Sequence, residues 1–162
     1  MKRTIAVVML LAGVAGGCFT LGERVLPESI QTVYIPYIKN QTMEYGVEEQ
    51  VTDTLIREFV KDGRLKVVSH PEDADSVLEG HISKYDISPG ERNAAGRTIS
   101  HFVDVSVVLT MRDLRTGEVI MEPTTFSEGG VYFLSTLPGR DRQTLILARL
   151  CEDVISRVIE GW

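Results

Sequence analysis

This sequence has few cysteines, no basic excess and no repeats, and each absence narrows what the protein can be. Only two cysteines occur in 162 residues, and the net charge is -6. A chain of that charge is not held on nucleic acid by a general basic field. No low-complexity tract or internal repeat occurs, and beyond the first residues no apolar run is long enough to span a membrane. With 43% hydrophobic and 25% charged residues, the composition is that of one globular domain.

The parts of an enzyme site are also missing. His70, His81 and His101 fall in separate predicted elements and lack the spacing of metal ligands. No glycine-rich phosphate loop follows a strand, and no nucleophile elbow occurs. We therefore predict no catalytic residue, no metal site and no cofactor.

The N-terminus carries the pattern of a secretory signal. Lys2 and Arg3 precede a short apolar stretch, and Ala15-Gly16-Gly17-Cys18 follows it. A basic start, an apolar run too short to span a bilayer and small residues before a cleavage point are typical of such signals. A cysteine directly after the small residues resembles the bacterial lipobox, although Ala15 stands where Leu is commoner.

These features predict how the chain is divided. We expect a signal peptide over residues 1–17, acylation of Cys18, a lipidated tether over 18–28 and a single α+β domain over 29–162. The alternatives are a plain secreted protein or a buried cysteine in a helix. If Cys18 is acylated, Cys151 has no partner for an internal disulfide. Its apolar surroundings at helical spacing predict a small core residue.

A central helix is predicted after position 46. Apolar residues recur at helical spacing and form one stripe about four turns long. Glu48 and Glu49 suit the positive end of the helix dipole, and Gly63 suits a left-handed C-terminal cap. Phe59 lies in the middle of the stripe, so we expect it in the core. The stripe consists of Val47, Val51, Leu55, Ile56, Phe59 and Val60.

Strands are predicted on both sides of this helix. The run 30–38 is rich in β-branched and aromatic residues, and 64–69 and 74–85 follow the helix. Alternation is clearest from Phe102 to Met111, and a hairpin turn with Gly117 leads into 118–127. Loops are expected over 39–45, 86–99 and 128–140, and Asp141 is expected to cap a closing helix over 142–160.

The predicted order is therefore β-α-β-β-β-β-α. This order favours an α+β fold with two helices packed on one face of a mainly antiparallel β-sheet.

Several segments together resemble one family, the lipopolysaccharide-assembly lipoproteins (the LptE family). The similarity covers essentially the whole predicted mature chain in one order, although Ile38 stands where an aromatic residue is usual. The segments that carry it are Leu26-Pro27, Ile30–Pro36, Asn40-Gln41-Thr42, Glu48–Val68, Ala74-Asp75, Leu78-Glu79-Gly80, Tyr85 and Arg112–Gly117.

The resemblance implies a function and a place in the cell. It implies a lipid-anchored lipoprotein on the periplasmic face of the Gram-negative outer membrane. Such a protein plugs and helps assemble an LptD-type outer-membrane β-barrel, and it assists lipopolysaccharide insertion into the outer leaflet. Phe19 after the cysteine, rather than Asp, resembles the residue choice of lipoproteins sent to the outer membrane. The alternative is an outer-membrane lipoprotein that scaffolds or activates a periplasmic cell-wall synthase.

Basic loop residues are the candidate lipopolysaccharide contacts. Arginine can donate two parallel hydrogen bonds to a phosphate, which lipid A and core sugars would offer. The alternative for each residue is an ordinary solvated loop charge. In an antiparallel sheet the two groups can lie at opposite ends, so one cluster is not required. The candidates are Lys84, Arg92 and Arg97 around the 86–99 loop, and Arg112 and Arg115 beside the hairpin turn.

Overall fold

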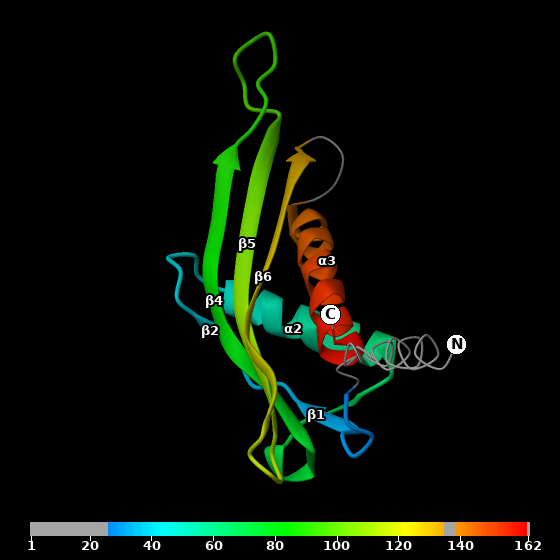
Figure 1. Cartoon of the computed structure of the whole chain (residues 1–162). Helices are drawn as coiled ribbons and strands as arrows, with labels where there is room; N and C mark the ends of the chain where they lie inside the picture. The colour runs from blue at the N-terminus through cyan, green and yellow to red at the C-terminus, as the bar shows by residue number, and fades with distance from the viewer. Residues whose placement is uncertain (1–25, 135–138, 162) are drawn as a thin grey trace, which may run out of the picture.

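The computed structural model describes residues 26–134 and 139–161. Two α-helices and six strands make up this part of the chain, with one short 3₁₀ turn, η1 (Figure 1). The strands are β1 (Thr32–Tyr34), β2 (Lys39–Asn40), β3 (Lys66–Val68), β4 (Ser76–Pro89), β5 (Ser100–Asp113) and β6 (Val119–Phe133). The helices are α2 (Val47–Asp62) and α3 (Gly139–Glu160), and η1 is Pro71–Asp73.

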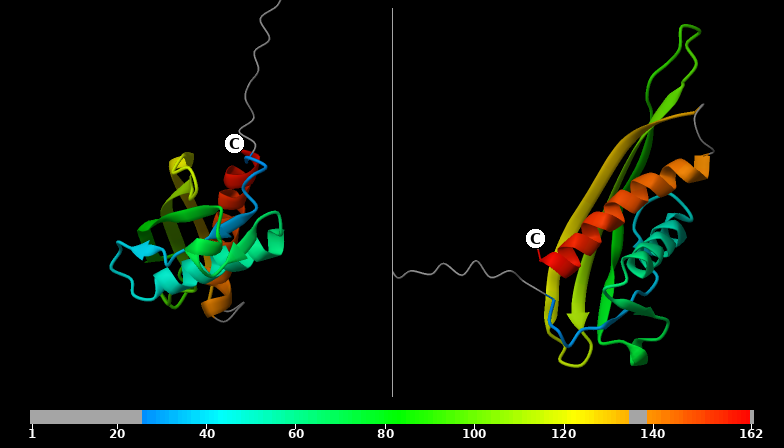
Figure 2. Two further views of the ribbon diagram at one scale, coloured as in Figure 1. Left: turned by 90° about the horizontal axis from the view of Figure 1, so that it is seen from below. Right: turned by 90° about the vertical axis from the view of Figure 1, so that its right-hand side faces the viewer.

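The sheet is mixed but mostly antiparallel. Its order is β3-β1-β4-β5-β6, and β2 pairs with β4 further along the same edge as β1. The short strands make parallel pairs: β1 with β3 and β4, and β2 with β4. Strands β4, β5 and β6 form a long antiparallel meander. Both helices lie on one side of this sheet (Figure 2, right). The predicted α+β fold with two helices on one face is confirmed.

Helix α2 forms as its sequence predicts. Val51, Leu55 and Phe59 are buried, and Glu48 and Glu49 lie in the first turn. Gly63 ends the helix in the left-handed region, with φ of 74°, and its N–H donates to the Phe59 carbonyl at 3.1 Å. Glycine favours this conformation because a side chain would be strained there. Most of the predicted stripe therefore packs into the core, but Val60 is exposed and Ile56 is only partly buried, so the buried face is narrower than predicted.

The core lies between the helices and the sheet, and β5, the middle strand of the meander, contributes much of it. Alternate residues of β5 point to the helices, and the register with β4 places Leu78 opposite Met111 and Ile82 opposite Val107 on that same face. Residues i and i+2 of a strand share a face, so this alternation makes one side of β5 apolar throughout. The buried apolar residues of β5 are Val103, Val105, Val107, Leu109 and Met111.

Cys151 of α3 is buried in the same core, as predicted. Burial raises the pKa of its thiol to about 12, because the thiolate is costly in an apolar site. The thiol is therefore protonated and unreactive at neutral pH. No helix in the described part of the chain is long and apolar enough to cross a membrane.

Several predicted boundaries differ from the structure. The run 30–38 is not one strand, because β1 ends at Tyr34 and β2 begins only at Lys39, with Pro36 between them. Proline has no N–H to donate to a neighbouring strand, which explains the break. The expected 86–99 loop shortens to residues 90–99, because β4 and β5 pair beyond the predicted ends.

Two further corrections concern the end of the sheet. Strand β6 continues to Phe133 instead of ending at position 127. The final helix begins at Gly139, so Asp141 lies inside the helix rather than at its N-terminal cap. The predicted signal peptide, Cys18 and most of the tether lie outside the described residues, and the predicted division of the chain remains a prediction.

Candidate functional site

The tip of the β4–β5 hairpin carries two of the predicted arginines. This hairpin projects beyond the helices at one end of the molecule (Figure 1). Arg92 and Arg97 are both exposed, and Arg92 is bridged to Thr98 across the loop. No ion pair involves either arginine within residues 26–134 and 139–161. Both guanidinium groups are therefore available to an anionic ligand.

Asn93 builds the turn that holds these arginines. Its backbone N–H donates to the Arg97 carbonyl at 2.9 Å, and its carbonyl accepts from the Gly96 N–H at 2.8 Å. Its side-chain Oδ1 accepts from the N–H groups of Ala95 and Arg97, each at 3.0 Å. Asparagine commonly forms such contacts with its own turn. The sequence thus positions the two arginines on an ordered loop.

The other predicted cations are already paired with carboxylates. Lys84 Nζ lies 2.5 Å from Asp104 Oδ2 across the β4–β5 pair, and this hydrogen bond raises the pKa of Lys84. Arg112 pairs with Glu79 across the same two strands. A cation held by a carboxylate must give up that contact, or share it, before it binds a phosphate.

Arg115 also has an anionic neighbour, at the hairpin turn between β5 and β6. Its guanidinium lies 3.7 Å from Asp113. Asp113 Oδ1 accepts the backbone N–H groups of Arg115 and Thr116 at 2.7 and 2.9 Å, and these hydrogen bonds lower the pKa of its carboxyl. Gly117 has φ of 75°, which confirms its predicted role in the turn. Asp113 thus stabilises the turn through these hydrogen bonds, and the Arg115 guanidinium lies beside its carboxylate.

The two groups of arginines lie far apart. Strand β5 has 14 residues, and at about 3.4 Å per residue it is roughly 45 Å long. Arg92 and Arg97 lie beyond one end of it, and Arg112 and Arg115 lie at the other. The structure therefore brings together Arg92 and Arg97 but does not join them to the hairpin pair.

Exposed apolar side chains lie next to the arginine tip, and sequence reasoning did not identify them. Phe102 pairs with Val131 in the β5–β6 register, and Phe133 pairs with Ser100 one step further. All three side chains are on the sheet face that the helices leave open, and all are exposed. The sequence does contain one sign of this patch, because Phe102 occupies a position on the otherwise polar side of the β5 alternation. Together, Phe102, Val131 and Phe133 form what we call the tip patch.

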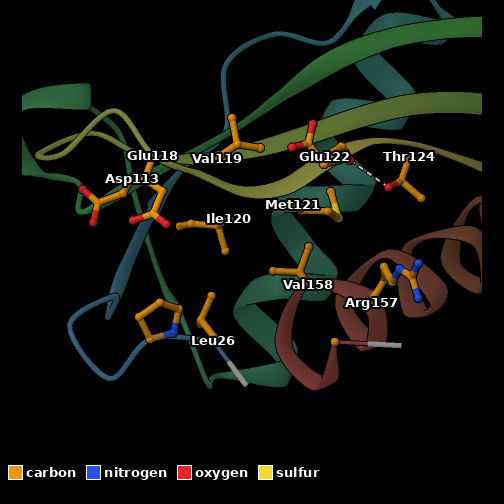
Figure 3. Close-up of a pocket in the computed structure, with 12 residues that line it drawn as sticks. Leu26, Asp113, Glu118, Val119, Ile120, Met121, Glu122, Thr124, Arg157 and Val158 are labelled. Atoms are coloured by element: carbon orange, nitrogen blue, oxygen red, sulfur yellow. Dashed lines mark hydrogen bonds between the residues drawn. The ribbon is translucent and has the colours of Figure 1, made fainter. Parts of the chain in front are cut away.

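One groove lies near the β5–β6 turn, at the end of the sheet away from the arginine tip, and Figure 3 shows the residues that line it. It has a volume of about 580 Å³, and Leu26, β6 and the end of α3 surround it. Its rim carries Glu118, Glu122 and Arg157. With more carboxylates than cations, this groove is poorly suited to a phosphate. Within the described residues, no group of three or more His, Cys, Asp or Glu side chains is placed to hold a metal ion.

The described residues form a domain of the α+β class, with a basic hairpin tip, an exposed apolar patch beside it and helices on only one face of the sheet. The chain belongs to the lipopolysaccharide-assembly (LptE) family, whose model matches residues 30–160. This is a family of non-catalytic assembly lipoproteins. Family membership confirms the resemblance seen in the sequence.

Solved structures share the fold at low sequence identity. A hypothetical protein from Chlamydia trachomatis is 14% identical with a TM-score of 0.58, over 82% of this chain and 97% of that one. An uncharacterised lipoprotein B from Nitrosomonas europaea is 12% identical with a TM-score of 0.54, over 84% and 85% of the two chains. PelC from Paraburkholderia phytofirmans, a dodecamer, is 16% identical with a TM-score of 0.51, over 80% and 91%. No curated protein matches the sequence.

Proposed function

We propose that this protein is an outer-membrane lipoprotein that plugs and helps assemble a lipopolysaccharide-translocating β-barrel of the LptD type. It assists lipopolysaccharide insertion into the outer leaflet and is held on the periplasmic face by acyl chains on Cys18. The observation that carries this proposal is the family match over residues 30–160. Two or three acyl chains give stable anchoring, whereas one gives only marginal membrane binding.

The chemistry of the hairpin tip supports a role with lipopolysaccharide. Arg92 and Arg97 are exposed cations on an ordered turn, and a phosphate accepts charge-assisted hydrogen bonds from arginine. The tip patch lies on the adjoining strands and offers apolar contact. Lipopolysaccharide has both phosphate and acyl groups, so one end of the molecule presents both kinds of complementary surface. Lys84, Arg112 and Arg115 are weaker candidates because each is paired.

Co-purification tests the assembly role directly. The lipidated protein, isolated from membranes in mild detergent, is expected to bring down a large outer-membrane barrel in a heat-labile complex. The purified protein is also expected to bind lipopolysaccharide. Recovery of a cell-wall synthase in place of the barrel would replace this function with the scaffold or activator role.

A further inference from the structure

The loop between β2 and α2 presents two large apolar side chains to solvent. Met43 is 96% exposed and Tyr45 is 95% exposed, the highest values among the large hydrophobic residues that the structure describes. This loop, residues 41–46, projects from the side of the molecule in two different views (Figures 1 and 2). It belongs neither to the arginine tip nor to the tip patch. Large exposed apolar groups brought together on one feature commonly mark an interaction site.

Asn40 holds this loop in one conformation. Its Nδ2 donates to the Glu44 carbonyl at 2.6 Å and to Glu48 Oε2 at 2.9 Å. Its Oδ1 accepts from both the backbone N–H and the hydroxyl of Thr42, each at 2.8 Å. The exposure of Met43 and Tyr45 is therefore a property of an ordered loop. A surface ordered before binding loses less conformational entropy when a partner binds.

The surroundings of the loop are acidic. Lys39 is the only cation between positions 37 and 53 of the sequence, and four carboxylates accompany it, on Glu44, Glu48, Glu49 and Asp53. Partial desolvation and the charges of Glu49, Glu48 and Asp53 raise the pKa of nearby Tyr37. An anionic membrane surface would repel such a loop. A protein surface with cations around an apolar pocket would attract it.

We propose that the 41–46 loop docks onto a partner protein, with Met43 and Tyr45 entering an apolar pocket whose rim carries arginine or lysine. The inference rests on the proposed function in one respect, since it takes the partner to be the barrel subunit. Met and Tyr are enriched at interfaces, and the exposed carboxylates of Glu44 and Glu49 lie close to Met43 and Tyr45 in the sequence, so they can face cations on the partner. A few such anchors usually supply most of the binding free energy.

The experiment measures how much barrel co-purifies with the full-length lipidated protein when both are expressed together. The double variant Met43→Ser/Tyr45→Ser is expected to reduce recovery about tenfold or more, the loss typical of anchor residues. Val60→Ser on α2 is the matched control, because Val60 is also exposed and lies outside the loop. It should leave recovery unchanged. All three positions are exposed, so the variants are expected to fold.

Two further variants test separately how the acidic charges and the ordered conformation of the loop contribute to barrel binding. Glu44→Lys/Glu49→Lys should weaken recovery and make the remainder less sensitive to salt, because attraction to a basic rim is screened by ions. Asn40→Ala keeps Met43 and Tyr45 but removes the contacts that order the loop, so recovery should fall by a smaller factor. A loop that binds only through exposed apolar area would be insensitive to both changes, and that result would overturn the proposal.

The remaining outcomes are distinguishable. If Met43→Ser/Tyr45→Ser recovers as much barrel as the parent, the docking loop is wrong and the assembly role stands. If the parent recovers no barrel, both the docking loop and the assembly role are wrong. If the unacylated Cys18→Ser protein floats with vesicles of anionic phospholipid and the same protein with Met43→Ser/Tyr45→Ser does not, the occupant is a lipid surface. If the parent alone dimerises in size-exclusion chromatography and the double variant does not, the occupant is a second copy.

Discussion

Asp75 and Thr32 exchange hydrogen bonds across 43 positions of the sequence. The Thr32 hydroxyl donates to Asp75 Oδ2 at 2.8 Å, and the same hydroxyl oxygen accepts the Asp75 backbone N–H at 2.7 Å. Oδ2 also accepts the backbone N–H groups of Gln31 and Thr32, at 3.0 and 2.9 Å. One carboxylate thus joins the start of β1 to the residue before β4. It fixes where the parallel part of the sheet meets the antiparallel meander.

The first prediction concerns the removal of this carboxylate. Asp75→Ala leaves the Thr32 hydroxyl and two backbone N–H groups without their acceptor, so we expect the free energy of unfolding to fall by about 2 kcal/mol. Chemical denaturation measures this loss. Asp75→Asn retains one oxygen acceptor and should lose less. Equal losses for the two variants would show that the hydrogen bonds at Oδ2 contribute little.

The same carboxylate makes stability depend on pH. The hydrogen bond from Thr32 comes first among the causes that lower the pKa of Asp75, followed by those from the backbone and by the charge of Arg115. A lowered pKa stabilises the folded state fully above the unfolded-state value, about 3.9. That contribution disappears as the pH falls through the folded-state pKa. Asp75→Asn should therefore lose stability less steeply than the parent below about pH 5.

The next prediction tests the packing of α2. Phe59 is 1% exposed, and Val60 beside it is 62% exposed. Phe59→Ala should lower the free energy of unfolding by about 3–5 kcal/mol, because it leaves a cavity between α2 and the sheet. Val60→Ala should change it by less than about 0.5 kcal/mol. A loss below about 1 kcal/mol for Phe59→Ala would contradict the core described above.

Much of the fold can be predicted because its patterns are local. The stripe of α2 and the alternation of β5 depend only on spacing within one element. The continuation of β6 through Gly129 and Gly130 could not be predicted, because glycine usually ends a strand pattern. The structure supplies a tertiary reason at Gly129. A Cβ there would come within 3.0 Å of the Phe102 ring on the neighbouring strand.

Whether each candidate cation is free or paired depends on strand register, which the sequence alone does not show. The sequence alone shows Lys84 and Arg112 as free basic residues, because their carboxylate partners are 20 and 33 positions away. Only the pairing of β4 with β5 places Asp104 and Glu79 beside them. The tip arginines differ because their turn is local, so their exposure follows from the loop sequence. Periodicity could not indicate the docking loop. The sequence alone does not show whether Met43 and Tyr45 are buried or exposed.

Acylation of Cys18 is the fourth prediction, and it concerns the segment before the described residues. Cys18→Ser should abolish labelling of the protein by a radioactive fatty acid and leave it soluble or retained at the inner membrane. Cys151→Ser is the control, because Cys151 is buried in the core and should not affect labelling. Labelling of the Cys18→Ser protein at the parent's level would rule out the lipid anchor at this residue.

The final prediction compares the two ends of the sheet in lipopolysaccharide binding. Arg92→Glu/Arg97→Glu should weaken binding about tenfold or more, because each arginine lost removes charge-assisted hydrogen bonds to phosphate. The parent's binding should weaken with salt, and that of the variant should respond less. Lys39→Glu/Lys66→Glu makes the same change in net charge away from the tip, and it should bind like the parent.

The reversal of the hairpin pair should have a different consequence. Arg112→Glu/Arg115→Glu places new carboxylates beside Glu79 and Asp113, so it should lower the free energy of unfolding while the folded protein still binds lipopolysaccharide. Binding and denaturation curves on the same samples separate the two effects. Because the barrel contact is expected to depend on a large surface, the Arg92→Glu/Arg97→Glu protein should still co-purify with the barrel. If neither pair changes lipopolysaccharide binding while the barrel still binds, the partner stands and the hairpin tip is not the contact.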